Sequence, residues 1–371
     1  MSSARIVRLD AWPIDVPLTK PFGIAGGAQE VARNAVVRVQ LEDGTVGHGE
    51  AAPFPAFNGD TQEAALEAIA RARDAIIGCD VADWKRAATL SREGIGPSGS
   101  ARCAIETAAL DASFRARRMR MFGWEGCHDT LRTDVTIPIG PVEECAADAG
   151  GWVERGFGRL KIKIGGAGFD DARARIVAVH RAAPAAELLL DGNAGLSSRD
   201  AVELLRALEV EGIRPILFEQ PCAKDDLDGL YAVAAAGEVP VALDETVSTA
   251  ADVERFASRR DFEARRFVVN VKLMKSGYGD ALGVAEAAGA KYGMRLMIGG
   301  MVEARMAMSA SACLAASGML AVDWAFVDLD TPLFLAEDPF EGGYAQTGDR
   351  LDLSPITAGH GVVPRDSRPS G

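Results

Sequence analysis

Five short apolar runs, spaced at nearly constant intervals, constrain the fold of this chain more than any other feature. The charged residues at their ends are Lys163, Asp191, Glu219, Asp244 and Lys272, which gives intervals of 28, 28, 25 and 28 residues. An interval of this length accommodates one strand, one helix and the two loops that join them. Uninterrupted apolar runs are typical of parallel strands that are buried on both faces. The spacing therefore predicts a repeated strand–helix unit.

The charges at the ends of these runs indicate where a site lies. A charge inside a buried strand is costly, but the carboxyl ends of the strands in a (β/α) barrel ring the active site. Three further strands are expected at 133–139, 295–298 and 322–327. Helices are expected between the strands, at 141–155, 170–183, 198–209, 227–236 and 279–291. Eight strands close a barrel, so we expect the five charged residues to share one pocket.

The chain before the barrel has a different pattern, which predicts an α+β domain with a small sheet. Strand-like segments at 7–17 and 35–41 are followed by a turn at 42–44 that indicates a hairpin. Helices are expected at 62–77, with Asp60 or Thr61 as N-cap, and at 81–91 and 101–118. The predicted fold class is α/β, with an α+β domain over residues 1–125, a barrel over 126–330, and a C-terminal segment over 331–371 that packs back on the first domain.

Composition excludes several classes of function. The chain has 371 residues, 48% of them hydrophobic, which is enough for one large core and a smaller second one. Its net charge of −13 argues against a nucleic-acid partner. No apolar stretch is long enough to span a membrane, and no apolar segment of a secretion signal follows the N-terminus, so we expect a cytoplasmic protein without membrane contact. Six scattered cysteines without a CxxC pair predict free thiols.

Three carboxylates predict a metal site. Asp191, Glu219 and Asp244 end three consecutive strands and offer the hard oxygen ligands that Mg²⁺ prefers. Without a cation, three carboxylates in one pocket would repel one another and retain protons. Each carboxylate taken alone has an alternative role, as a helix cap or as the partner of a lysine. Their common register favours the metal site.

Two lysines flank the predicted metal site and are candidate acid–base groups. Lys163 precedes the three carboxylates by one strand and Lys272 follows them by one strand, so their amines should face the metal from opposite sides. Lys161 lies on the same strand face as Lys163, and repulsion between the two charges is expected to lower the pKa of Lys163. A lysine with a lowered pKa can act as a base near neutral pH. The alternative is that these lysines are solvated or structural.

These motifs also resemble a known family. Lys161-Ile162-Lys163, Asp191-Gly192-Asn193, Glu219-Gln220-Pro221, Asp244-Glu245-Thr246 and the segment 270–275 resemble the muconate-lactonizing subgroup of the enolase superfamily over nearly the whole chain. The resemblance implies a modified (β/α)₇β TIM-type barrel with an N-terminal α+β capping domain. It also implies Mg²⁺ as cofactor and an enediolate intermediate formed by a lysine base.

Within that subgroup, Asp328-Leu329-Asp330 at the end of the predicted eighth strand resembles the Asp-x-Asp motif of the dipeptide epimerases, such as the alanyl-glutamate epimerases. The similarity implies that this Asp-x-Asp pair holds the ammonium of a dipeptide, and that the enzyme transfers a proton at the carbon next to the carboxylate. The alanyl-glutamate epimerases carry an arginine in the first-domain loop, whereas residues 20–28 contain none. Lys20 is an alternative partner for glutamate, while Phe22, Phe54 and Phe57 favour an apolar side chain. The expected substrate-binding residues are Asp328, Asp330, Thr136, Lys161, Phe22 and Met301.

Other functions remain open from the sequence. A cycloisomerase, an o-succinylbenzoate synthase or an N-acylamino-acid racemase would use the same scaffold, and none of them needs an ammonium clamp. A non-catalytic ligand-binding relative is a further alternative, although all five charged strand-end residues are present. Gly94 to Gly99 matches GxGxxG, but a predicted helix precedes it, which argues against a nucleotide site. We expect a homo-oligomer that binds a small-molecule substrate.

Overall fold

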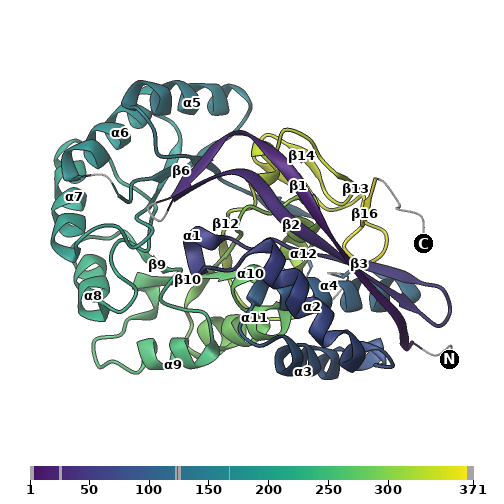
Figure 1. Cartoon of the computed structure of the whole chain (residues 1–371). Coiled ribbons are helices and arrows are strands. Elements are labelled where there is room, and N and C mark those ends of the chain that lie inside the picture. Colours follow the sequence, from purple (N-terminus) through teal and green to yellow (C-terminus); the bar gives the residue numbers. More distant parts are fainter. Residues whose placement is uncertain (1–3, 25–26, 122, 124–126, 167, 366–371) are drawn as a thin grey trace.

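A computed structural model describes residues 4–24, 27–121, 123, 127–166 and 168–365. Its centre is an eight-stranded parallel sheet whose strands follow one another in chain order (Figure 1). Backbone Asp134 N donates to Val327 O at 2.9 Å, which joins the two outermost strands and curls the sheet into a barrel. The strands are β5 (Val135–Ile137), β6 (Arg159–Lys163), β7 (Glu187–Asp191), β8 (Leu217–Glu219), β9 (Val241–Leu243), β10 (Phe267–Lys272), β11 (Arg295–Gly299) and β12 (Trp324–Val327). The predicted fold class is confirmed.

Helices cover the outside of this sheet (Figure 1). Several begin with a side-chain cap on a free backbone N–H, as Ser197 does for α7 and Thr249 with Asp252 does for α9. The bounds of the predicted helices lie within a few residues of the observed ones. The helix predicted at 279–291 is observed as an α-helix followed by a π-helix over Glu286–Lys291. The helices are α5 (Val142–Glu154), α6 (Phe169–Ala182), α7 (Ser198–Val210), α8 (Leu227–Ala235), α9 (Ala250–Ala257), α10 (Leu273–Ser276), α11 (Tyr278–Ala285) and α12 (Arg305–Ala316).

The register of the parallel strands brings the charged strand ends to one edge. Lys163 on β6 lies beside Asp191 on β7, and Asp191 lies beside Glu219 on β8. Asp244 directly follows β9, and Lys272 is the last residue of β10. Because neighbouring parallel strands share their direction, these side chains project from the same end of the barrel. The spacing in the sequence therefore predicted both the barrel and the position of its charged edge.

The chain before the barrel forms a three-stranded antiparallel sheet with helices packed against it. The sheet consists of β1 (Ile6–Ile24), β2 (Gly27–Leu41) and β3 (Val46–Ala51), and the helices are α1 (Pro55–Asn58), α2 (Gln62–Ile76), a 3₁₀ turn (Val81–Asp83), α3 (Trp84–Ile95) and α4 (Gly99–Ala116). The strand β3 packs closely on α4 because Gly47 and Gly49 lack side chains. A Cβ at Gly47 would lie 2.3 Å from Ala108 O, so no larger residue fits there without movement. Thr61 accepts from Ala64 N as the predicted cap of α2.

The C-terminal segment forms short strands that the sequence analysis did not predict. They are β13 (Phe340–Gly342), β14 (Ala345–Thr347), β15 (Arg350–Asp352) and β16 (Val362–Pro364), and β15 pairs with β4 (Thr130–Arg132). Strands of three residues are too short for an alternating pattern to appear in the sequence. The segment also contacts the first part of the chain, where His360 N donates to Asp111 Oδ1 at 3.0 Å and Ala336 N donates to Pro17 O at 2.8 Å. The division of the chain at residues 125 and 330 stays a prediction.

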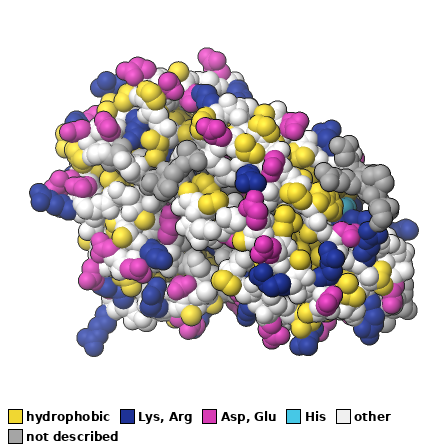
Figure 2. Space-filling view, viewed as in Figure 1, with side chains coloured by type: hydrophobic (Ala, Val, Ile, Leu, Met, Phe, Trp, Pro, Cys, Tyr) yellow, Lys and Arg dark blue, Asp and Glu magenta, His cyan; other side chains and the backbone are white. Residues whose placement is uncertain are grey.

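The prediction of free thiols is confirmed. All six cysteines are free. On the face seen in Figure 2, the basic and acidic side chains of the described residues are interspersed. None of the helices in the described residues is both long and apolar enough to cross a lipid bilayer. Residues Gly94 to Gly99 run from the end of α3 to the start of α4, so no strand precedes the GxGxxG match.

Candidate active site

The barrel edge gathers lysines and carboxylates that are almost completely excluded from solvent. Asp191, Glu219 and Asp244 are fully buried, and Lys163 and Lys272 are each 5% exposed. Lys163 Nζ donates to Asp191 Oδ2 at 2.6 Å, and Lys272 Nζ donates to Asp244 Oδ2 at 2.7 Å. The fold thus brings the five predicted residues together, with one lysine beside the first carboxylate and the other beside the last.

Lys275 holds Asp244 in place, which the sequence analysis did not foresee. Its Nζ donates to Asp244 Oδ1 at 2.9 Å and to the carbonyl oxygens of Asp244, Val247 and Asn270. Burial alone would raise the pKa of Asp244, but the charges of Lys272 and Lys275 lower it well below the usual range. Asp244 is therefore an ionised carboxylate with a fixed orientation. The place of Lys275, three residues after Lys272 and within the helical turn Leu273–Ser276, was the available signal.

Glu219 has one oxygen that accepts no hydrogen bond among the described residues, and the nearest cation, Lys161 Nζ, lies 3.6 Å from it. Asn270 Nδ2 donates to Glu219 Oε1 at 2.5 Å, while Glu219 Oε2 is buried and has no hydrogen-bond partner among the described residues. Burial and the neighbouring charge of Asp191 raise the pKa of Glu219 to about 7. An unpartnered buried carboxylate oxygen is costly, and a hard divalent cation would remove that cost. Asp191, Glu219 and Asp244 therefore fit a magnesium ion by their chemistry.

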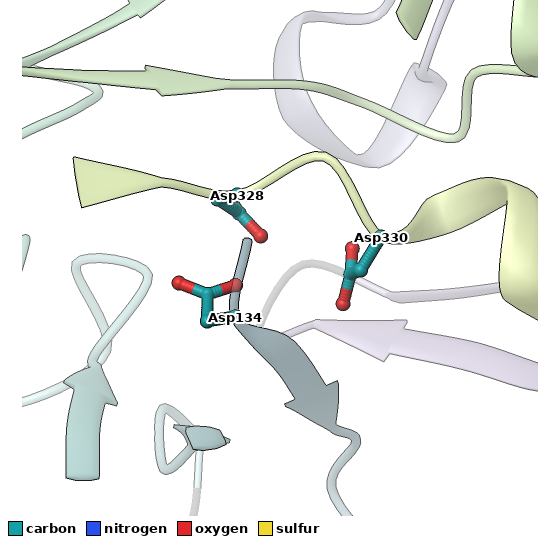
Figure 3. A group of neighbouring side chains, drawn as sticks. All are labelled: Asp134, Asp328 and Asp330. Atoms are coloured by element: carbon teal, nitrogen blue, oxygen red, sulfur yellow. The ribbon is translucent and has the colours of Figure 1, made fainter. Parts of the chain in front are cut away.

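A second acidic cluster lies on the other side of Lys161. Oxygen atoms of Asp134, Asp328 and Asp330 all lie within 4.8 Å of one another, and the three carboxylates face a common space (Figure 3). Among the described residues, the carboxylate oxygens of this cluster lie closer together than those of the predicted metal-ligand trio. Each member of the trio instead forms an ion pair with a lysine: Asp191 with Lys163, Asp244 with Lys272 and Lys275, and Glu219 with Lys161 at 3.6 Å. Asp134 was missed by the sequence analysis, although an acid beside a predicted buried strand was a visible signal.

Hydrogen bonds fix two members of this second cluster. Lys161 Nζ donates to Asp328 Oδ2, and the backbone N–H of Thr136 donates to Asp330 Oδ2 at 2.5 Å. Burial lowers the pKa of Lys161, but the charges of Asp328 and Glu219 outweigh burial and raise it well above its usual value. Burial and the charge of Asp328 raise the pKa of Asp330 to about 6. Lys161 is therefore a permanent cation between the two acidic groups, and its predicted effect on Lys163 stays a prediction.

Lys163 and Lys272 from the first set and Asp328 and Asp330 from the second line one pocket, which the first part of the chain covers. Phe54 and Phe57, from the loop after β3 and from α1, lie opposite the barrel edge, and Lys272 Nζ lies 5.7 Å from the centre of the Phe57 ring. The barrel contributes Thr136, Lys161, Lys163, Asn193, Lys272, Gly300, Met301, Asp328, Asp330 and Thr331. Five of the six residues predicted to bind substrate thus line this pocket. The sixth is Phe22 on β1, whose side chain lies outside the described part of the structure.

Two more charged side chains, those of Lys20 and Glu303, do not line the pocket. The side chain of Lys20 is 62% exposed, and its Nζ bonds Asp148 Oδ1 on α5 at 2.8 Å. It is not part of the pocket wall, so it is not placed to pair with a glutamate side chain in the pocket. Glu303 is fully buried, its Oε1 accepts from Met301 N at 2.8 Å, and burial raises its pKa to about 8. Glu303 therefore supports the wall of the pocket from behind Met301.

Comparisons with known proteins agree with this geometry. Residues 8–122 match the family described as mandelate racemase/muconate lactonizing enzyme, N-terminal domain, and residues 144–368 match the enolase C-terminal domain-like family. The chain is 44% identical to an aromatic dipeptide epimerase of Herpetosiphon aurantiacus over 96% of this chain and 98% of that protein.

Two solved structures are also similar. A mandelate racemase/muconate lactonizing enzyme from Roseiflexus sp. is 48% identical, with a TM-score of 0.90 and coverage of 98% of this chain and 99% of that one. The dipeptide epimerase of Enterococcus faecalis V583, solved with Mg and the dipeptide L-Leu-L-Tyr, is 29% identical, with a TM-score of 0.89 and coverage of 96% and 99%. These similarities extend over both the barrel and the sheet that covers its pocket.

Proposed function

Because this chain belongs to the mandelate racemase/muconate lactonizing enzyme family of the enolase superfamily, we propose that it is an isomerase, a Mg²⁺-dependent dipeptide epimerase. The reaction is a proton transfer at the carbon next to the substrate's carboxylate, by which that carbon inverts. The observation that carries this proposal is the pair of buried lysines, Lys163 and Lys272, on opposite flanks of three buried carboxylates.

In this mechanism the two lysines act on opposite faces of one carbon. One lysine removes the α-hydrogen, and the other, which carries a proton, returns a hydrogen to the opposite face. Asp191, Glu219 and Asp244 hold the metal, and Lys275 keeps Asp244 oriented. When bound, Mg²⁺ supplies positive charge that stabilises the ionised α-carbon and offsets the carboxylate charges that raise the pKa of Lys272. Exclusion of water from this buried edge strengthens these charge interactions.

The amino terminus of the substrate lies, in this proposal, between Asp328 and Asp330. Both carboxylates line the pocket on the far side of Lys161 from the metal ligands, so a dipeptide extends from the metal to this pair. A buried carboxylate pair binds an ammonium by charge-assisted hydrogen bonds. A cycloisomerase, an o-succinylbenzoate synthase and an N-acylamino-acid racemase act on substrates without this ammonium, and the buried acid pair favours the epimerase over all three.

We extend the proposal to the substrate's side chain, which we expect to be apolar or aromatic. Phe54, Phe57 and Met301 border the pocket, whereas Lys20 is bonded to Asp148 outside it. The similar protein from Herpetosiphon aurantiacus is an aromatic dipeptide epimerase, and the similar structure from Enterococcus faecalis holds L-Leu-L-Tyr. Cytoplasmic location and assembly into a homo-oligomer also belong to this proposal and rest on the sequence.

A screen of dipeptides for α-hydrogen exchange in D₂O tests the proposed function. The enzyme loaded with Mg²⁺ should incorporate deuterium at the second residue of L-alanyl dipeptides, and L-Ala-L-Phe should react faster than L-Ala-L-Glu. A chelator should stop the exchange. Exchange with N-acyl amino acids but with no free dipeptide would replace the epimerase by an acylamino-acid racemase.

A further inference from the structure

The acidic cluster of Asp134, Asp328 and Asp330 contains one carboxyl group that the proposed mechanism does not use. Asp134 is 1% exposed, yet neither of its carboxylate oxygens has a hydrogen-bond partner among the described residues. Figure 3 shows this group directed toward the other two acids. A buried carboxylate without a hydrogen-bond donor is unfavourable, whereas a neutral carboxylic acid can donate its own hydrogen. Its neighbour Asp328 offers the acceptor.

The charges around the cluster leave it with an excess of negative charge. From β6, Lys161 Nζ bonds Asp328 and also lies 3.6 Å from Glu219 on β8 and 4.0 Å from Asp191 on β7. From β10, Lys272 is bonded to Asp244 and acts on Asp328 only at longer range, as does Lys163, which is bonded to Asp191. Lys161 is therefore the one cation in contact with the cluster among the described residues, and it is shared with two further carboxylates.

Counting charge shows what would balance the cluster. Three ionised carboxylates beside one protonated lysine carry a net charge of −2, which is unfavourable in a buried site. One retained proton reduces the excess to one, and an ammonium in place of that proton gives the same value. Consistent with this, burial and the charge of Asp328 raise the pKa of Asp134 well above its usual value. The proton and the ammonium are thus equivalent in charge for this cluster.

We propose that Asp134 holds one proton in the free enzyme and that the substrate's ammonium displaces this proton when it binds to Asp328 and Asp330. This inference rests on the proposed function, because it assumes a substrate with a free amino terminus. The O–H bond of Asp134 breaks, its proton passes to solvent along the pocket that Asp330 lines, and the ammonium keeps all of its hydrogens. Asp134 lies behind Asp328 and does not line the pocket, so it is a positioning residue that tunes the ammonium site.

Calorimetry of ligand binding in buffers with different heats of ionisation tests the proposal. The ligand is L-alanyl-glycine, which has an ammonium group but no stereocentre at its second residue, so it cannot be epimerised. The enzyme is loaded with Mg²⁺ at neutral pH. Wild-type enzyme should release about one proton per ligand bound, by the charge count above. Asp134→Asn should still bind the ligand and release almost none. The KM of wild-type enzyme for dipeptides should fall as pH rises toward neutrality, and this dependence should flatten in Asp134→Asn.

N-acetylation of the ligand is the matched control, since it removes the ammonium and should abolish proton release from wild-type enzyme. Binding of L-alanyl-glycine without proton release, or equal release by Asp134→Asn, would overturn this inference and leave the epimerase proposal intact. Failure of every dipeptide to bind would overturn both. If Asp134→Asn does not fold, infrared difference spectra of wild-type enzyme decide the matter. The carbonyl band of a protonated carboxylic acid should disappear on binding, and an unchanged spectrum would contradict the proposal.

Discussion

The two acidic clusters of the pocket differ in how their charge is balanced. Each of the three carboxylates on the metal side has a contact that balances or anchors it: Asp191 has Lys163, Asp244 has Lys272 and Lys275, and Glu219 has Asn270. In the cluster of Asp134, Asp328 and Asp330, only Asp328 forms an ion pair with a cation among the described residues, and that cation is Lys161. Lysines of the protein balance the charge of the first cluster, whereas the second cluster has an excess of negative charge that a bound cation reduces. Catalysis needs the first to be rigid, and recognition of an ammonium needs the second to be deficient in positive charge.

Removal of a metal ligand should have the largest effect of any change in the pocket. Asp191→Asn, Glu219→Gln or Asp244→Asn removes a charged oxygen donor without a change in size, and each should reduce kcat/KM by about 10³-fold or more, because catalysis here depends on the bound charge. Chelation should do the same to wild-type enzyme. The rate of deuterium incorporation measures both effects. Undiminished activity of a metal-free preparation would refute the role of this cluster.

Loss of the lysine that orients Asp244 should weaken the metal site without destroying it. Lys275→Met keeps the length of the side chain but removes four hydrogen bonds. We expect the affinity for Mg²⁺ to fall by about 10- to 100-fold, as is typical when a group that orients a ligand is lost. A titration of activity against Mg²⁺ measures this shift, and saturating metal should restore most of kcat.

Lys291→Met is the control for Lys275→Met, because Lys291 pairs with Glu254 on the surface. It should leave the Mg²⁺ titration unchanged. A Lys275→Met enzyme whose Mg²⁺ affinity equals that of the control would show that the metal side does not depend on this orientation.

A change in the second cluster should affect binding more than turnover. Asp330→Asn removes one charge of the proposed ammonium clamp, and a charge-assisted hydrogen bond of about 1.5–3 kcal/mol corresponds to a rise in KM of roughly 10- to 100-fold. The kcat should change much less. Steady-state kinetics with L-Ala-L-Phe provides the measurement. A fall in kcat at constant KM would instead place Asp330 in the chemical step.

The smallest effect is expected at Lys20, which lies outside both clusters. Its exposed ion pair with Asp148 contributes about 0–1 kcal/mol to stability, and it does not line the pocket. Lys20→Ala should therefore change kcat/KM for L-Ala-L-Phe by less than about twofold. The same variant should be compared on L-Ala-L-Glu. A selective loss of activity on the acidic dipeptide would mean that Lys20 turns into the pocket and binds the substrate's side chain.

The difference between the two clusters also explains what the sequence could predict. The convergence of the five charged residues on one barrel edge was predictable, because these residues end consecutive strands at a nearly constant spacing; their role in metal binding stays a proposal. The fold followed from the same spacing. The Asp-x-Asp pair was found only through its resemblance to a family, since two aspartates after a strand are common at a surface.

Contacts between distant segments were not predictable. Asp134 faces Asp328 because the first and last strands of the barrel meet. Thr136 and Asp330, which are bonded across this junction, are 194 residues apart in the sequence, and no periodic pattern indicates a contact over that distance. The role of Lys275 depends on a helical turn that directs its amine back to carbonyl groups of the loop after β9 and of β10. The short strands β13 to β16 likewise owe their pairing to tertiary contacts. The sequence pattern therefore identified which residues lie at the ends of the strands, but the closure of the barrel determined which residues they contact.

If Lys163 and Lys272 serve opposite faces of one carbon, deuterium exchange by variants that keep only one of these two lysines will separate the two faces. With Lys163→Ala, the isomer whose α-hydrogen faces Lys272 should still exchange that hydrogen with D₂O, the other isomer should not, and net epimerisation should vanish. Lys272→Ala should show the reverse preference. NMR of L-Ala-L-Phe and L-Ala-D-Phe measures the exchange of each isomer. If both variants exchange the α-hydrogen of both isomers, neither lysine is the base for its face, and the proposed mechanism is wrong.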